Sequence, residues 1–196
     1  MQNTDKPVLH ACIIGIGRFT NFPSSHKVNR PACADSARAM VDMLINNADN
    51  LAVPLGTIEC LISDPRDDPN DLSKLAKTHA VYDPRDEDDL YVEAGTTADV
   101  EAATNEWLNR IREGTENSLG AKPGDHILLY VCSHGVAGRD KTALAILEDT
   151  DPDPSSNKPY EGILDLKMFS MCAPACLLYT SPSPRDRTRS RMPSSA

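Results

Sequence analysis

The chain has 196 residues and a net charge of −9 at pH 7, with 29 Asp and Glu against 20 Lys and Arg. Such an acidic chain is a poor partner for nucleic acid or an anionic membrane surface, and no apolar run approaches the roughly 20 residues of a membrane span. The length predicts one domain, and the first residues lack a basic region followed by an apolar core, which predicts a cytoplasmic protein.

Strand-like and helix-like patterns alternate along the chain. Strands are expected at residues 8–16, 55–62 and 127–132, with a weaker edge strand at 143–147. Helices are expected at residues 34–46, at 98–113 with Thr97 as N-cap, and from 163 to 171. Residues 64–95 form a long polar insertion. Because alternating strands and helices imply parallel pairing, we expect an α/β fold, a three-layer sandwich with a mainly parallel central sheet.

Five cysteines precede residue 176 and none has a CxxC spacing. Cys12, Cys60 and Cys132 lie in the strand-like runs, which favours buried reduced thiols, because free cysteine packs like a small hydrophobic residue.

The most informative segment is HILLYVCSHG, residues 126–135. Its six apolar or aromatic residues predict a buried parallel strand in the middle of the sheet. Ligands and catalytic groups gather at the carboxyl ends of such strands, which is where His134 and Gly135 stand. The alternative for His134 is an ordinary strand-end histidine on the surface.

This strand, the His-Gly step and the upstream segments resemble the caspase-like cysteine peptidases, in particular their bacterial, fungal and metacaspase branches. Ser133 stands where the family more often has Gly. The segments that resemble the family's first strand, first helix, second strand and later helix are Val8–Phe19, Pro31–Leu44, Leu55–Ser63 and Thr96–Ile111. The resemblance covers roughly residues 8–175.

The resemblance implies a cysteine-type endopeptidase that acts on protein or peptide substrates without a cofactor. It makes His134 the general base and acid, and the backbone N–H of Gly135 a donor to the oxyanion. Asp35 matches an acidic position that holds a basic substrate side chain in metacaspase-like members, although Cys33 stands one residue too close to it. Capping of the helix is the plainer interpretation of Asp35, and Arg30 supports the opposite specificity, for an acidic side chain.

The acidic insertion, with Asp64, Asp67, Asp68 and Asp71 and a second group from Asp83 to Asp89, could bind Ca²⁺. Its spacing lacks an EF-hand pattern, which favours a solvated loop.

Residues 176–196 resemble the translation of a transposase-type sequencing adaptor; the alternative is a natural disordered tail rich in Ser, Pro and Arg. We therefore expect residues 1–175 to be a partial, C-terminally truncated catalytic domain. The nucleophilic cysteine is expected downstream of Ala175, with Cys172 in a helix and Cys132 in the core, so the chain itself is expected to be inactive.

Two other functions remain. The chain could be an inactive caspase-like interaction or scaffold module, which the presence or absence of the missing cysteine would decide. Gly15-Ile16-Gly17 after a strand suggests nucleotide binding, but no third glycine follows at the right spacing. A serine hydrolase is disfavoured because no GxSxG occurs.

Overall fold

The computed structural model describes residues 7–23, 25–48, 50–67, 94–111, 125–137, 142–153 and 161–167. Its elements in chain order are β1 Leu9–Ile16, α1 Ser25–Val28, α2 Pro31–Asn46, β2 Leu55–Ser63, α4 Thr97–Ile111, β3 His126–Cys132, β4 Gly135–Ala137, β5 Ala143–Ile146 and β6 Ile163–Asp165. The three predicted core strands and the two predicted long helices are confirmed.

The main sheet has the strand order β2-β1-β3, and both pairings are parallel. β1 is fully buried after its first residue, and β2 is buried throughout. A parallel strand is covered on its two faces, which accounts for the mostly apolar sequences of both strands; the polar residues His10, Thr57 and Glu59 within them are buried as well. The expected α/β class with a parallel sheet is confirmed.

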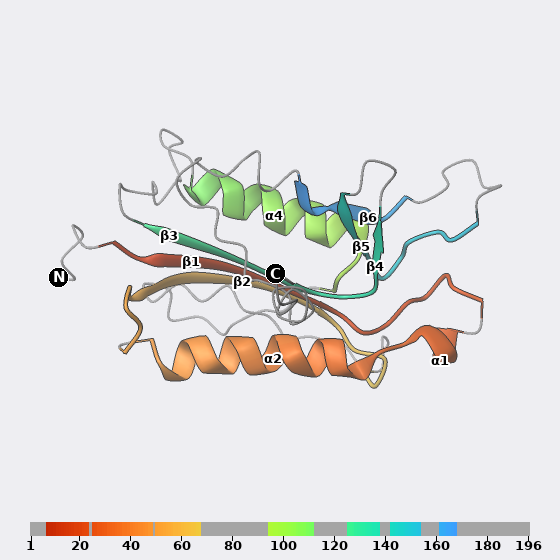
Figure 1. Cartoon of the computed structure of the whole chain (residues 1–196), viewed down its shortest axis with the longest axis horizontal. Helices are drawn as coiled ribbons and strands as arrows, with labels where there is room; N and C mark the ends of the chain where they lie inside the picture. The colour runs from red at the N-terminus through yellow and green to blue at the C-terminus, as the bar shows by residue number, and fades with distance from the viewer. Residues whose placement is uncertain are drawn as a thin grey trace, which may run out of the picture.

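Helices cover the two faces of this sheet, as Figure 1 shows: α2 lies below it and α4 above it. The α2 side is packed with side chains from alternate positions, among them Ala11 and Ile13 of β1 and Ala37 and Leu44 of α2. The opposite side is built around Trp107 of α4, which is 2% exposed. The alternation of β1 between the two clusters follows from the two-residue period of a strand.

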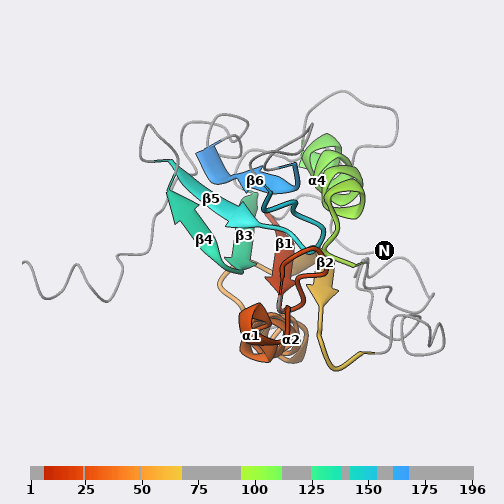
Figure 2. The ribbon, with the colours of Figure 1, turned by 90° about the vertical axis from the view of Figure 1, so that its right-hand side faces the viewer.

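A second, antiparallel sheet with the order β4-β5-β6 stands beside α4, at one end of the main sheet (Figure 2). The predicted edge strand at 143–147 is therefore confirmed as β5. The helix expected from residue 163 is wrong at its start, because Ile163–Asp165 pairs with β5 as β6. Leu164 is buried in this pairing. Three residues are too few for a strand period to show in the sequence.

Both long helices begin differently from the prediction. α2 starts at Pro31, where a fixed φ suits the first turn and the missing N–H has no helical partner to lose. The N-cap of α4 is Thr96, not Thr97: the Asp99 N–H donates to Thr96 Oγ1 at 3.3 Å, and the Thr96 hydroxyl donates to the Asp99 carboxylate at 2.6 Å. Thr97 instead bonds Asp149 through its N–H and its hydroxyl.

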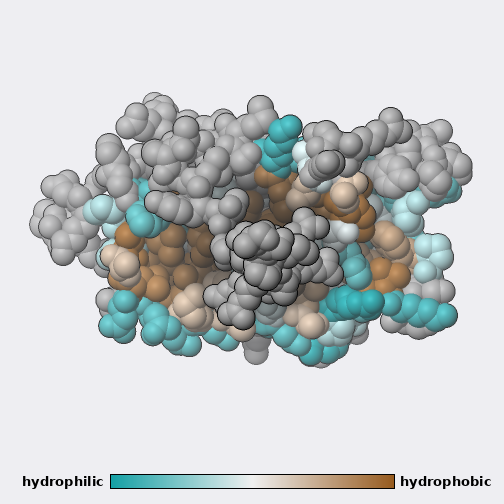
Figure 3. All heavy atoms as spheres, in the orientation of Figure 1, coloured by the Kyte–Doolittle hydropathy of each residue, from teal (hydrophilic) through white to brown (hydrophobic). Residues whose placement is uncertain are grey.

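β3 is less buried than predicted. Its first residue is exposed and the other six are half-buried. Among the described strands of the main sheet, β1 is the central one and β3 pairs with β1 alone. In Figure 3 apolar side chains form a brown band between the two helix layers, where β3 runs. The apolar sequence of β3 therefore reflects a strand that the described residues cover only in part.

No helix in the described ranges is both long enough and apolar enough to cross a membrane. Residues 176–196, the predicted non-native tail, lie outside the described residues.

Candidate functional site

His134 lies two residues after the end of β3, immediately before β4, and its backbone is hydrogen-bonded to β5. The N–H of Ile146 donates to the carbonyl oxygen of His134 at 2.9 Å. The Ser133 hydroxyl donates to the carbonyl oxygen of Ile146. These two bonds, one residue apart, hold the chain where it leaves the main sheet and enters the small one. Ser133 thus has a structural role at this point of the chain.

The imidazole of His134 is oriented by the segment before α2. Its Nε2 lies 2.8 Å from the carbonyl oxygen of Val28. A carbonyl oxygen only accepts hydrogen bonds, so Nε2 carries the proton, and in the neutral ring Nδ1 is left as an acceptor. The ring of Phe19 packs against it with centroids 5.0 Å apart and a tilt of 43°. The side chain is half-buried, so it is held in place and still reachable.

Gly135 opens β4 and is exposed. A Cβ at this position would meet only the carbonyl oxygen of Leu144, at 3.7 Å, which is ordinary contact. The fold itself therefore does not require glycine here.

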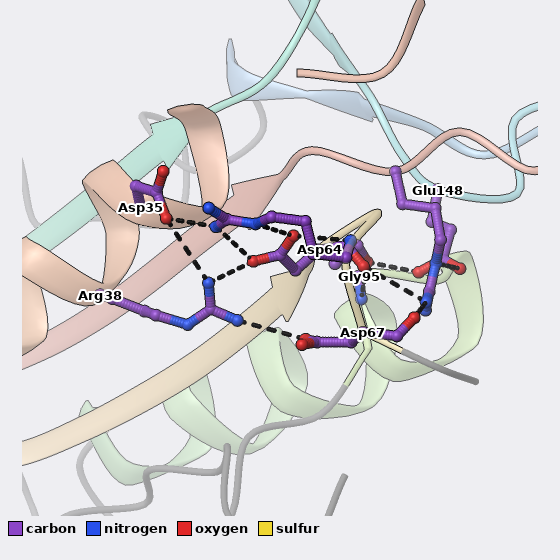
Figure 4. Close-up of polar contacts among 9 residues, drawn as sticks. Asp35, Arg38, Asp64, Asp67, Gly95 and Glu148 are labelled. Atoms are coloured by element: carbon purple, nitrogen blue, oxygen red, sulfur yellow. Dashed lines mark hydrogen bonds and ion pairs between the residues drawn. The ribbon is translucent and has the colours of Figure 1, made fainter. Parts of the chain in front are cut away.

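Asp35 lies in α2 with its side chain 55% exposed, and it does not cap the helix. It pairs instead with Nη2 of Arg66, and more loosely with Nη1 of Arg38 at 3.8 Å (Figure 4). The capping interpretation of Asp35 is therefore wrong. The carboxylate already has guanidinium partners from the protein itself.

The centre of this network is Asp64, the residue after β2, whose side chain is 2% exposed. Arg66 donates to it through Nε at 2.9 Å, through Nη2 at 2.6 Å and through its backbone N–H at 2.9 Å, and Arg38 donates through Nη1. Burial by itself would raise the pKa of Asp64, but these hydrogen bonds outweigh it and hold that pKa well below its usual range. Arg38 also reaches Asp67, at 3.2 Å.

A second polar cluster ties the loop after β1 to the end of β5. Glu148 is buried and accepts from Nε of Arg18 at 2.7 Å and from the hydroxyl of Ser63. The N–H of Gly95 donates to Ser63 Oγ at 2.7 Å. Arg18 also reaches the carbonyl oxygens of Asp64 and Asp67. Figure 4 shows Glu148 and Gly95 on one side of Asp64 and Arg38 on the other.

Sequence reasoning missed Arg18 and Glu148. The available signal was weak: Arg18 is the first charged residue after a mostly apolar strand, at the edge where functional groups collect. Nothing near Arg18 in the sequence points to Glu148.

The cysteines fall into two classes. Cys12 and Cys60 are buried and free; burial raises the pKa of Cys60 to about 12 and holds that of Cys12 above its usual range. Cys33 and Cys132 are free but only half-buried. The prediction that Cys132 is a buried core thiol is therefore wrong, because β3 is not fully covered. Cys172 and Cys176 lie outside the described residues.

Arg30, the alternative substrate-selecting charge, is exposed. Its Nη1 donates to the carbonyl oxygens of Lys27 and Asn29, both at 2.9 Å.

The acidic insertion, the candidate Ca²⁺ site, is described only in part. Asp64 and Asp67 bind arginines, and Asp68, Asp71 and residues 83–89 lie outside the described residues. No group of three or more His, Cys, Asp or Glu suited to a metal ion occurs within the described ranges.

Comparison of the chain with protein-family models, curated proteins and solved structures finds no match in any of the three.

Proposed function

We propose that this chain carries the histidine half of a cysteine-type endopeptidase site, and that the peptidase belongs to the caspase-like family that the sequence resembles. The observation that carries the proposal is the hydrogen bond from Nε2 of His134 to the carbonyl oxygen of Val28. A general base needs one ring nitrogen fixed as a donor and the other free to accept. His134 meets this requirement at the carboxyl end of a strand of the main sheet.

In this mechanism Nδ1 of His134 takes the proton of a cysteine thiol, and the thiolate attacks the carbonyl carbon of the scissile peptide. The backbone N–H of Gly135 is the proposed donor to the oxyanion. The protonated ring then gives its proton to the departing amine, leaving an acyl-cysteine that water hydrolyses. The nucleophilic cysteine is expected downstream of Ala175, beyond the described residues.

Arg30 is the better placed of the two charges proposed to select the substrate. It lies two residues after Val28, whose carbonyl contacts His134, and its guanidinium is exposed. Asp35, in contrast, is paired with Arg66 and Arg38. The arrangement favours a substrate with an acidic side chain next to the scissile bond, because a guanidinium binds a carboxylate in a two-pronged geometry.

The test begins by reading the coding sequence across codon 175 by a method that uses no transposase. We expect the frame to continue into an apolar strand that ends in Cys, and the extended protein to cleave a fluorogenic peptide with Asp before the reporter faster than one with Arg. His134→Gln is expected to lower kcat/KM by about 10²- to 10⁴-fold. His126→Gln, an exposed histidine at the other end of β3, is the matched control and is expected to retain activity.

Three outcomes would reject the proposal in whole or in part. A frame that continues without a cysteine would assign the chain to the inactive scaffold alternative. Full activity of the His134→Gln variant would remove His134 from the mechanism. In the 196-residue chain itself, a ¹H–¹⁵N spectrum that places the ring proton of His134 on Nδ1 would contradict the tautomer.

A further inference from the structure

Gly15 of β1 is the point where α2 comes closest to the main sheet. A Cβ on Gly15 would lie 2.4 Å from the Cβ of Ala37 and 2.9 Å from the carbonyl oxygen of Cys33. In the register of β1 and β3, the partner of Gly15 is Cys132. Because adjacent strands are about 4.8 Å apart, the start of α2 lies over the end of β3, and Cys33 lies close to Cys132.

A neighbouring contact confirms this alignment. The hydroxyls of Ser36 and Tyr130 share a hydrogen bond. Ser36 is nearly one helical turn after Cys33, and Tyr130 is two residues before Cys132, so each pair has its members on the same helix face and the same strand face. Cys33 and Cys132 are the next pair along the same two faces, so their thiols face one another where α2 packs on β3.

We propose that Cys33 and Cys132 form a reversible disulfide that fastens the start of α2 to the end of β3, making this edge of the sheet a redox-controlled site. Both residues are half-buried and free, so a small oxidant can reach them. The site does not depend on peptidase chemistry.

The oxidant is a low-molecular-weight disulfide such as oxidised glutathione. The thiolate of Cys132 attacks one of its sulfur atoms, and one glutathione leaves as a thiolate. Cys33 then loses its proton to solvent and attacks the sulfur of Cys132, releasing the second glutathione. Two protein thiols are oxidised and one glutathione disulfide is reduced. Burial, followed by the interaction with Cys132, raises the pKa of Cys33 to about 11, so Cys33 carries little thiolate for the first attack.

The other two cysteines of the described sheet, Cys12 and Cys60, are not expected to react with the oxidant or to form the disulfide. Cys12 packs on the α4 side of the sheet and Cys60 on the α2 side, and both are buried. Burial raises the pKa of each thiol, which suppresses the reactive thiolate.

The disulfide would reinforce a link that already exists. The His134 imidazole is bonded to Val28, so residues 28–33 and 132–134 are already joined once. Closing a loop of about 100 residues restricts the unfolded chain strongly, and oxidation is expected to raise the melting temperature by on the order of 5–15 °C.

The experiment equilibrates the full 196-residue chain in glutathione buffers from fully reducing to fully oxidising, alkylates free thiols, and maps the non-reduced digest by mass spectrometry. We expect one dominant linked pair of peptides, containing Cys33 and Cys132, which disappears on reduction. The rise in melting temperature on oxidation should be lost in Cys132→Ser and Cys33→Ser and retained in Cys60→Ala, the matched buried control.

Independent alkylation of Cys33 and Cys132 at every glutathione ratio would overturn the proposal. So would linkage of either residue mainly to another cysteine. Because the peptide map uses the unaltered chain, these outcomes can be read even if a variant fails to fold.

Discussion

Replacing Asp64 by Asn tests whether the arginine network holds the loop after β2 in place. The substitution keeps the shape of the side chain and removes its charge, leaving Arg38 and Arg66 without their shared buried carboxylate. Hydrogen bonds to a charged group contribute about 1.5–3 kcal/mol each, but Arg38 is one-third exposed and its share is reduced by solvent. Arg66 is about half exposed, so water screens its interaction with Asp64 further.

The expected cost of Asp64→Asn is therefore about 1.5–3 kcal/mol of unfolding free energy at pH 7. This corresponds to a melting temperature lower by roughly 3–10 °C. The matched control is Asp67→Asn, because Asp67 accepts from Arg38 at 3.2 Å and its side chain is 30% exposed. The control is expected to cost less than about 1 kcal/mol. Urea titration followed by circular dichroism measures both.

The pH dependence gives a second check on the same residue. The pKa of Asp64 is lower in the folded protein than the value of about 3.9 in an unfolded chain. The stability that the ionised Asp64 contributes to the folded protein is present above pH 4, and it is lost as the pH falls through the pKa of Asp64 in the folded state. The difference in stability between wild type and Asp64→Asn should thus shrink steadily below pH 4. Equal losses for Asp64→Asn and Asp67→Asn at pH 7, or a difference that does not change with acid, would refute the reasoning.

Two further substitutions test the packing around the sheet. Gly15→Ala should lower the free energy of unfolding, measured by urea titration, by about 1–3 kcal/mol, because the added Cβ would collide with α2. The control Gly135→Ala, whose Cβ has room, should change it by less than about 0.5 kcal/mol. Equal effects of the two substitutions would contradict the close approach of α2. Trp107→Ala should cost about 3–5 kcal/mol in the same assay, since this fully packed side chain anchors the α4 cluster; a cost below 1 kcal/mol would show that the cluster does not depend on it.

The parts of the fold that could be predicted are those in which the apolar pattern of a single helix or strand indicates which of its side chains are buried. Ala37, Val41 and Leu44 share a helix face in the sequence and are buried in α2. Val100 and Trp107 do the same in α4. The mostly apolar sequences of β1 and β2 likewise predict strands covered on both faces. In each case the signal lies within one segment, as a helical period or as a mostly apolar stretch.

The parts that were missed depend on residues far apart in the chain. Arg18 and Glu148 are separated by 130 positions, and Arg66 reaches Asp35 across 31. No local period encodes such pairs, because they form only after the loops at the sheet edge have been placed. The same holds for His134: its position after a strand was predicted, but its hydrogen bond to Val28, 106 residues earlier, was not. The proposed chemistry at this residue rests on that bond.

The central position of β1 has a consequence for how the chain reaches its fold. One edge of β1 pairs with β2, the nearer strand in the sequence, with Leu9 opposite Leu55. The other edge pairs with β3, which is synthesised much later, with Leu9 opposite His126. Pairing over such separations slows folding, because the long loop must be closed before its contacts can stabilise it. During synthesis on the ribosome, a β1–α2–β2 unit would therefore emerge with the second edge of β1 unpaired until β3 has been made. An unpaired apolar edge is prone to aggregation, so this is the interval in which protection by a chaperone matters most.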